Sequence, residues 1–314
     1  MACTQGIPEK LSALLVKIET TSCADALPSG VDHLLVSNLS ITPTVESHER
    51  DVLSGDYVNP VNISGKKFMT MTYDVEVKGS NTAVDTAPPV GPVLRSAGFT
   101  ETVNGSTSVV YTLNNTGPEA VTVYAYQNGV VYRLLGGKSN VSFTGNAGEI
   151  AQFSVTTTGL FGGRTDESIP TLTTDLAKPP PFLNASLTAS GFSTTPIVST
   201  INFDMGNEIN VIPSITASGG YGGPQLTNRS ITGSWNPLET VATTHDHWDD
   251  LISANQTKIT FTVGSTATNR VTIILNQVTP TDTSKENREG LLGLNIPFMI
   301  GQHPTDSEVQ LTFN

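Results

Sequence analysis

Residues 66–78 read KKFMTMTYDVEVK, and this stretch alternates between two kinds of side chain almost without a break. The apolar set consists of Met69, Met71, Tyr73, Val75 and Val77. The polar set consists of Thr70, Thr72, Asp74 and Glu76. Because successive side chains of a strand point to opposite faces of a sheet, the alternation predicts a half-buried β-strand whose apolar face packs in a core.

The composition of the whole chain extends this prediction to a mainly β protein. Its 314 residues include 44 Thr, 28 Ser and 22 Asn, and only 14% are charged. Such usage suits many short strands better than long surface helices. The length fits two cores of ordinary size. No apolar run reaches the roughly 18 residues of a membrane-spanning helix, and the N-terminus lacks a signal-peptide layout, so we expect a soluble, unsecreted chain.

The charge balance and the cysteines exclude two classes of protein. The chain has 16 Lys and Arg against 28 Asp and Glu, a net charge of −12. Stable nucleic-acid binding needs clustered cations that neutralise phosphates, so this balance disfavours it. Cys3 and Cys23 are the only cysteines and lie close together in the sequence, so a disulfide framework is excluded.

A long charged segment precedes the alternating strand. Residues 34–45 alternate enough to form a second strand, and residues 46–65 between the two strands predict a loop with little apolar content. A loop that long inside a compact domain is usually functional or disordered, because ordering it costs entropy. We therefore expect it to bind something, through a set of side chains that comprises Glu46, His48, Glu49, Arg50, Asp51, Asp56 and Tyr57.

The rest of the first half predicts further strands and one helix. Residues 7–18 fit either a helical stripe or a strand. The apolar spacing of residues 90–97, with Pro before and Gly98 after, predicts a short helix. Asn128 and Gly129 indicate a tight hairpin turn. Strands are expected at residues 108–113, 121–127, 130–135, 138–144 and 151–159.

A change in amino-acid composition then predicts a domain boundary. Residues 161–182 contain paired glycines, a Thr-rich stretch and three consecutive prolines at 179–181, which together favour a semi-rigid connector. We place the boundary near residue 175. The chain thus divides into residues 1–174 and 175–314.

Beyond the connector the same order of elements recurs. A strand at residues 201–214 is followed by a Gly-rich loop at 218–224, a return strand at 226–235 and a helix at 243–255 that Thr243 caps. Strands at 258–263 and 269–277 then match residues 108 onward. In both halves a helix follows a long hairpin, so we infer a diverged duplication.

No catalytic or metal-binding site is expected. On the predicted helix, His245 and His247 lie about 200° apart, and only pairs such as His245 with Asp249 or His247 with Asp250 share a face. Acidic residues in a first helical turn, where the helix dipole favours them, are therefore expected rather than a metal site. His33, His48 and His303 lack the neighbours of a catalytic triad, and a Gly-x-Ser-x-Gly motif is missing. The Gly-rich loop lacks the Lys of a nucleotide-binding loop.

Several strings resemble the major tail tube proteins of long-tailed, siphovirus-type bacteriophages. They are KIETT at residues 17–21, LVSNLSITP at 35–43, ERD at 49–51, TAPPVGPVLRSAGF at 86–99 and GEI at 148–150. The resemblance covers residues 10 to about 175, and the second half joins it only through its likeness to the first.

The resemblance implies a fold of two tandem tail-tube-like β-sandwich or barrel domains, each with one flanking helix, the first with an N-terminal arm. Such subunits join sheets around a channel and stack in rings, and residues 46–65 match the loop that reaches the adjacent ring. Two domains per chain suggest trimeric rings with pseudo-sixfold symmetry. Expected partners are other copies of the chain and the tape measure, tail-tip and terminator proteins, with no cofactor and no membrane.

The resemblance also implies where the protein is found and what it does. The protein is expected in the virion tail after assembly in the host cytoplasm, and DNA should pass through the tube without binding. The polar set Thr70, Thr72, Asp74 and Glu76 is then expected to face the lumen, the alternative being that it faces outward. A carbohydrate-binding or adhesive β-sandwich and a glycosidase are the competing classes, although only two tryptophans occur and no pair of carboxylates stands out.

Overall fold

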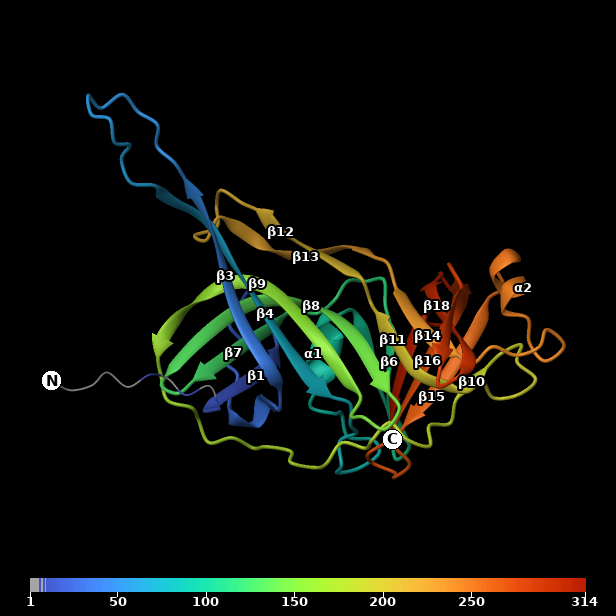
Figure 1. Ribbon diagram of the computed structural model, residues 1–314. Coiled ribbons are helices and arrows are strands. Elements are labelled where there is room, and N and C mark those ends of the chain that lie inside the picture. Colours follow the sequence, from blue (N-terminus) through green and yellow to red (C-terminus); the bar gives the residue numbers. More distant parts are fainter. Residues whose placement is uncertain (1–5, 7, 9) are drawn as a thin grey trace.

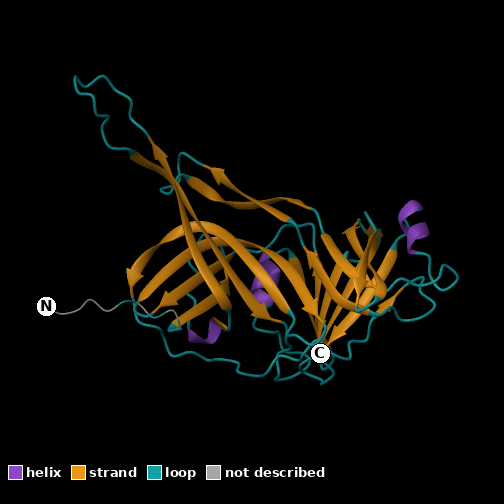
Figure 2. Ribbon diagram, viewed as in Figure 1, coloured by secondary structure: helices purple, strands orange, loops and turns teal. Residues whose placement is uncertain are grey.

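The computed structural model describes residues 6, 8 and 10–314, and it confirms the mainly β class. Two β lobes lie side by side, and each contains one short α-helix (Figures 1 and 2). Cys3 and Ile7, which the sequence analysis named, lie outside the described residues. None of the helices in the described part is long and apolar enough to cross a membrane.

The first lobe is built from the N-terminal half of the chain. Its strands are β1 (Ser12–Ile18), β2 (His33–Leu34), β3 (Ser37–His48), β4 (Ile63–Glu76), β5 (Phe99–Asn104), β6 (Ser108–Leu113), β7 (Val121–Gln127), β8 (Val130–Asn146) and β9 (Gln152–Asp166). Its helices are α1 (Gly91–Ser96) and the 3₁₀ turn η1 (Gly30–Asp32).

The second lobe follows an extended connector at residues 167–187. Its strands are β10 (Thr188–Ala189), β11 (Val198–Asp204), β12 (Asn207–Pro213), β13 (Tyr221–Arg229), β14 (Thr232–Pro237), β15 (Thr257–Val263), β16 (Val271–Pro280), β17 (Ser284–Arg288), β18 (Leu291–Ile300) and β19 (Val309–Phe313). Its α-helix is α2 (His247–Ile252). As the sequence predicts, a helix follows the long hairpin in each half.

The pattern of residues 66–78 places β4 correctly. Met69 and Met71 are fully buried, and Tyr73 is 2% exposed. β4 pairs with β3 on one side and β9 on the other, so its apolar face covers the core of the first lobe. The segment before residue 18 is a strand and not a helix, because β1 pairs along its length with β7.

The two lobes share one core and one sheet. Seventeen strands are joined by hydrogen bonds, because β11 pairs with β8 and β19 pairs with β6 across the boundary between the lobes. Phe143 of β8 stacks on Phe203 of β11 at a ring-centroid distance of 5.4 Å and lies 5.4 Å from Phe261 of β15. The two lobes are therefore joined by paired strands and a shared aromatic cluster, and the boundary near residue 175 stays a prediction.

Replacing Phe143 by Ala should destabilise both lobes together. The ring is fully buried at the junction, and its removal leaves a cavity that costs about 3–5 kcal/mol. We expect one calorimetric transition at a lower temperature than in the wild type. Two separate transitions, of which only one shifts, would show that the lobes unfold independently.

Several predicted boundaries are wrong in detail. The strand expected at residues 201–214 is two strands, β11 and β12, and the return strand expected at 226–235 falls in β13 and β14. β3 and β4 continue into the predicted loop, so only residues 49–62 connect them. Tyr221 already begins β13, so part of the Gly-rich loop is strand. β9 extends to Asp166, inside the predicted connector. The second helix begins at His247, and Asp246 caps it by accepting hydrogen bonds from the backbone N–H groups of Trp248 and Asp249. Thr243 is thus not the cap.

Candidate functional site

A long hairpin projects from the first lobe. β3 and β4 pair up to His48 and Ile63, whereas β9 pairs with β4 only from Phe68 to Glu76. The outer part of β4 therefore has one strand neighbour, and the hairpin extends into solvent away from both lobes (Figure 1). Of the predicted contact residues, Glu46 and His48 lie on β3, and Glu49, Arg50, Asp51, Asp56 and Tyr57 lie in the tip loop at residues 49–62.

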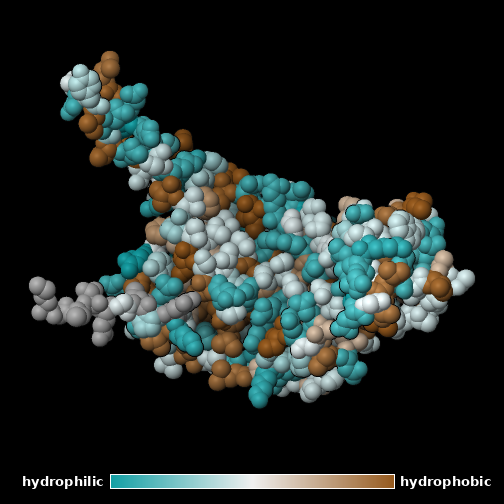
Figure 3. Space-filling view, viewed as in Figure 1, coloured by the Kyte–Doolittle hydropathy of each residue, from teal (hydrophilic) through white to brown (hydrophobic). Residues whose placement is uncertain are grey.

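The tip loop exposes large apolar side chains. Leu53 and Tyr57 are fully exposed, at 106% and 107%. Figure 3 shows brown, apolar residues among the polar ones along this projection. Further exposed apolar residues there are Val52, Val58, Val61 and Ile63. The prediction of a loop with little apolar content is wrong, and a monomer that displays such a group of side chains has a surface suited to a partner.

The hairpin β12–β13 of the second lobe braces the base of this projection. The backbone N–H of Lys67 donates to the carbonyl of Gly219 at 3.0 Å. The ring of Tyr221 meets Phe68 edge to face at 5.7 Å, and its hydroxyl donates to Glu46 at 3.2 Å. Sequence reasoning missed this contact, because residues 46 and 221 lie far apart in the chain.

An ion pair completes the brace. Lys66 Nζ lies 3.1 Å from Glu46 Oε1. The hydrogen bond from Lys66 lowers the pKa of the Glu46 carboxyl, and the same bond raises the pKa of Lys66. Burial raises the pKa of Tyr221, so its hydroxyl stays protonated and donates to Glu46. The ion pair joins β3 to β4, and Tyr221 links it to β13 of the second lobe.

Replacing Tyr221 by Ala should loosen the projecting hairpin. The side chain is 8% exposed, and losing its ring costs about 3 kcal/mol. We expect faster amide hydrogen exchange at residues 44–48 and 63–67, together with a lower unfolding midpoint. The control Tyr221→Phe keeps the ring and loses only the hydroxyl bond, at a cost of about 1 kcal/mol or less. Unchanged exchange in Tyr221→Ala would mean that the brace does not hold the hairpin.

A continuous polar surface crosses both lobes. Strand register puts Asp74, Ser154, Ser142, Asp204 and Thr232 opposite one another in a row across β4, β9, β8, β11 and β14. A parallel row runs through Glu76, Gln152, Thr144, Asn202 and Ser234, and a third through Ser40, Thr72, Thr156 and Asn140. We call these residues the polar face.

The polar face carries carboxylates and no cation. Asp74 accepts hydrogen bonds from Asn38 at 2.7 Å and from Ser154 at 2.5 Å, and Asp204 accepts one from Asn140 at 2.8 Å. Thr72, Thr156 and Thr144 are exposed. Lys138 lies on β8 two residues before Asn140 of the polar face. Its side chain is buried and donates a hydrogen bond to the Pro118 carbonyl. A shallow hollow lies where the lobes meet, lined on the polar face by Ser142, Thr144, Asn202, Asp204, Thr232 and Ser234.

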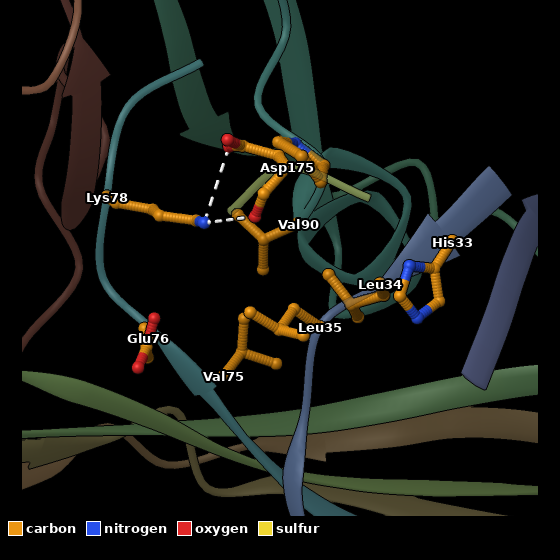
Figure 4. Close-up of a pocket in the computed structure, with 9 residues that line it drawn as sticks. His33, Leu34, Leu35, Val75, Glu76, Lys78, Val90 and Asp175 are labelled. Atoms are coloured by element: carbon orange, nitrogen blue, oxygen red, sulfur yellow. Dashed lines mark hydrogen bonds and ion pairs between the residues drawn. The ribbon is translucent and has the colours of Figure 1, made fainter. Parts of the chain in front are cut away.

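Glu76 lies at the end of β4, beside a small pocket. Figure 4 shows Lys78 pointing toward Asp175, while the carboxylate of Glu76 stands apart from that pair. Lys78 Nζ lies 3.3 Å from Asp175 Oδ2 and donates to the carbonyls of Asp175 and Ala177. The pocket therefore lies where the end of β4 meets the connector at residues 167–187. Glu76 takes no part in the ion pair there and belongs to the polar face.

Several strands offer free edges for lateral contacts. Among the described strands, β5 pairs only with β6, and β17 pairs only with β18. An unpaired edge presents backbone N–H and C=O groups that another chain can bind. The chain has few exposed aromatic side chains on which a sugar ring could stack. Trp235 is 5% exposed, and of the two tryptophans only Trp248 is substantially accessible.

Comparison with known protein families agrees with this picture of a mainly β protein with surfaces for assembly. A family model described as phage tail tube protein matches residues 10–308. The chain therefore belongs to the phage tail tube protein family, and it is a structural component of the virion tail. A search of curated proteins finds no match.

Proposed function

We propose that this protein polymerises into rings that stack into the hollow tube of the tail, through which DNA passes to the host. The observation that carries the proposal is the projecting hairpin with its exposed apolar tip. The hairpin is braced at its base and exposes apolar side chains at its tip. The tip can therefore bury these side chains in an interface with a second molecule. Copies of this chain are the partner that the proposal requires.

The tip loop contacts the adjacent ring. Burying a Leu or an aromatic side chain stabilises an interface by roughly 1.5–3 kcal/mol each. The expected polar contact is thus replaced by one with an apolar centre, formed by Leu53 and Tyr57, and a charged rim that includes Glu49, Arg50 and Asp51. Such an arrangement is common in specific protein interfaces.

The polar face lines the channel. A lining of hydroxyl, amide and carboxylate groups offers DNA no cation to bind, and the carboxylates repel its phosphates. Thr72, Asp74 and Glu76 are then only one strand of a lining that both lobes supply. Thr70 lies in the next row, opposite Thr158, at the edge of this face. This arrangement is supported by the strand register, which keeps polar residues opposite one another across the lobe boundary.

Electron microscopy of the purified protein tests the proposal. We expect long hollow filaments or stacked rings, whereas monodisperse monomers at high concentration would count against it. In virions the tape measure protein would occupy the lumen, and the tail-tip and terminator proteins would bind the ends. Assembly would take place in the host cytoplasm before the tail joins the particle.

We expect three chains in each ring. Each chain supplies two lobes, and a closed ring needs every heterologous interface to be satisfied. Three chains then give six lobes with pseudo-sixfold symmetry. The rotational symmetry of tube cross-sections and the native mass of isolated rings measure this directly. Rings of six chains would contradict both the stoichiometry and the inferred duplication.

A further inference from the structure

Two histidines and an aspartate come together at the start of α2, at the far end of the second lobe from the projecting hairpin (Figure 1). One ligand atom from each of His245, His247 and Asp250 lies within 4.8 Å of the other two. The helix begins only at His247, so His245 precedes it and folds back, with the two imidazole centroids 4.7 Å apart. The separation of about 200° expected on a longer helix therefore does not occur, and both imidazoles can approach one ion.

The ring of His247 is the member of this cluster that makes no hydrogen bond within the described residues. The residue is 5% exposed, and within the described residues no hydrogen bond reaches either of its ring nitrogens. Its ring nitrogens are thus not tied up by the protein and can coordinate an ion. His247 and Asp250 line a small cavity together with Trp235, so the cluster has space beside it.

The other two residues are held in place by their neighbours. The ring of His245 stacks on Phe192 at a centroid distance of 3.5 Å. Asn255 Nδ2 donates to Asp250 Oδ1 at 3.2 Å, which leaves Oδ2 turned toward the histidines. Second partners of this kind orient the ligands of metal sites.

A path to solvent reaches the cluster. His245 and Asp250 line an open polar hollow on the surface, and Asp250 also lines the small cavity beside His247. A hydrogen bond of 2.6 Å between His245 Nε2 and Asp250 Oδ2 accounts for two of the three residues. That bond does not involve His247, whose ring supplies the third potential ligand atom.

We propose that His245, His247 and Asp250 bind one divalent transition-metal ion of the zinc class. Two imidazoles and one carboxylate suit Zn²⁺ and Co²⁺, whereas Ca²⁺ and Mg²⁺ prefer sites made of oxygens. Bonds of about 2.0–2.2 Å to such an ion would set the ligand atoms roughly 3.3 Å apart. His245 Nε2 and Asp250 Oδ2, now 2.6 Å apart, would separate, and the other distances, now within 4.8 Å, would adjust toward that value. The proton between His245 and Asp250 leaves when the metal binds.

With three protein ligands, a fourth position remains for water from the hollow. The ion would tie α2 to the segment that precedes it. This site is independent of tube formation, since it lies away from the tip loop and the polar face.

Metal titration of the full-length protein tests this proposal. After treatment with a chelator, Zn²⁺ should bind with a stoichiometry of one per chain by calorimetry. Co²⁺ should give the intense visible absorption of a four-coordinate ion. The absence of saturable one-to-one binding, or a weak octahedral Co²⁺ spectrum, would overturn the proposal without recourse to any variant.

Variants then assign the ligands. His247→Ala and the isosteric Asp250→Asn should each weaken Zn²⁺ binding by at least about tenfold. The control His48→Gln with His303→Gln removes two histidines elsewhere and should bind as the wild type does. Circular dichroism of each metal-free variant checks its fold. Undiminished binding in a folded His247→Ala protein would contradict the assignment.

Discussion

A variant whose tip loop is removed should be a folded, soluble monomer that forms no tubes. His48 and Ile63 face each other at the end of the hairpin, so residues 49–62 can be replaced by an Asn-Gly turn without altering the paired strands. The change removes Leu53 and Tyr57 from each proposed contact between rings. Together they contribute at least about 3 kcal/mol, which corresponds to a 100-fold or larger rise in the concentration needed for assembly.

Sedimentation and negative-stain microscopy measure this effect, and circular dichroism confirms that the variant is folded. The point variant Leu53→Ser with Tyr57→Ser should have the same defect in weaker form. Leu176→Ser is its matched control, because Leu176 is 77% exposed but lies on the connector, away from the hairpin. Tubes of normal length from the loop-replaced protein would rule out the tip loop as the contact between rings.

Placing cations on the polar face should slow DNA delivery while leaving the tube intact. Thr72→Lys and Thr144→Lys suit this test, since both side chains are exposed and Asp74 and Asp204 keep their hydrogen bonds. Each chain would present two new cations to the DNA. Because every cation adds a salt-dependent phosphate contact, we expect infectivity to fall by about tenfold or more, with a smaller loss at high ionic strength.

The matched control is Thr72→Glu with Thr144→Glu, which alters the same positions with the opposite charge and should deliver DNA normally. Charge reversal of Asp74 and Glu76 to Lys should act in the same direction as the threonine variants. Virions that carry the Lys variants, have tails of normal length and infect at wild-type rates would show that this face does not line the channel.

Local sequence signals predicted the elements whose cause is local. The alternation of residues 66–78 identified the buried face of β4, and the apolar spacing after residue 89 identified α1. Asn128 and Gly129 both adopt positive φ, as the tight turn between β7 and β8 requires. In each case the residues that form the element also carry the physical reason for it.

Features that depend on distant partners left no such signal. The outer halves of β3 and β4 are solvated on both faces, so residues 46–48 and 63–65 do not alternate and were interpreted as loop. The pairing of β11 with β8 continues the polar face across the lobes, but it joins strands from opposite sides of the connector. The cap of α2 was misplaced because Thr243 and Asp246 are both good N-cap residues, and only packing decides between them.

The shared core of the two lobes has a consequence for how fast a ring can nucleate. Phe143 and its neighbours fasten one lobe to the other within a single chain, so that junction exists before any encounter between molecules. A ring of three such chains requires three bimolecular contacts, whereas six separate lobes would require six. The rate of nucleation then depends on a lower power of protein concentration, and rings can start at levels where single-lobe subunits would remain dispersed.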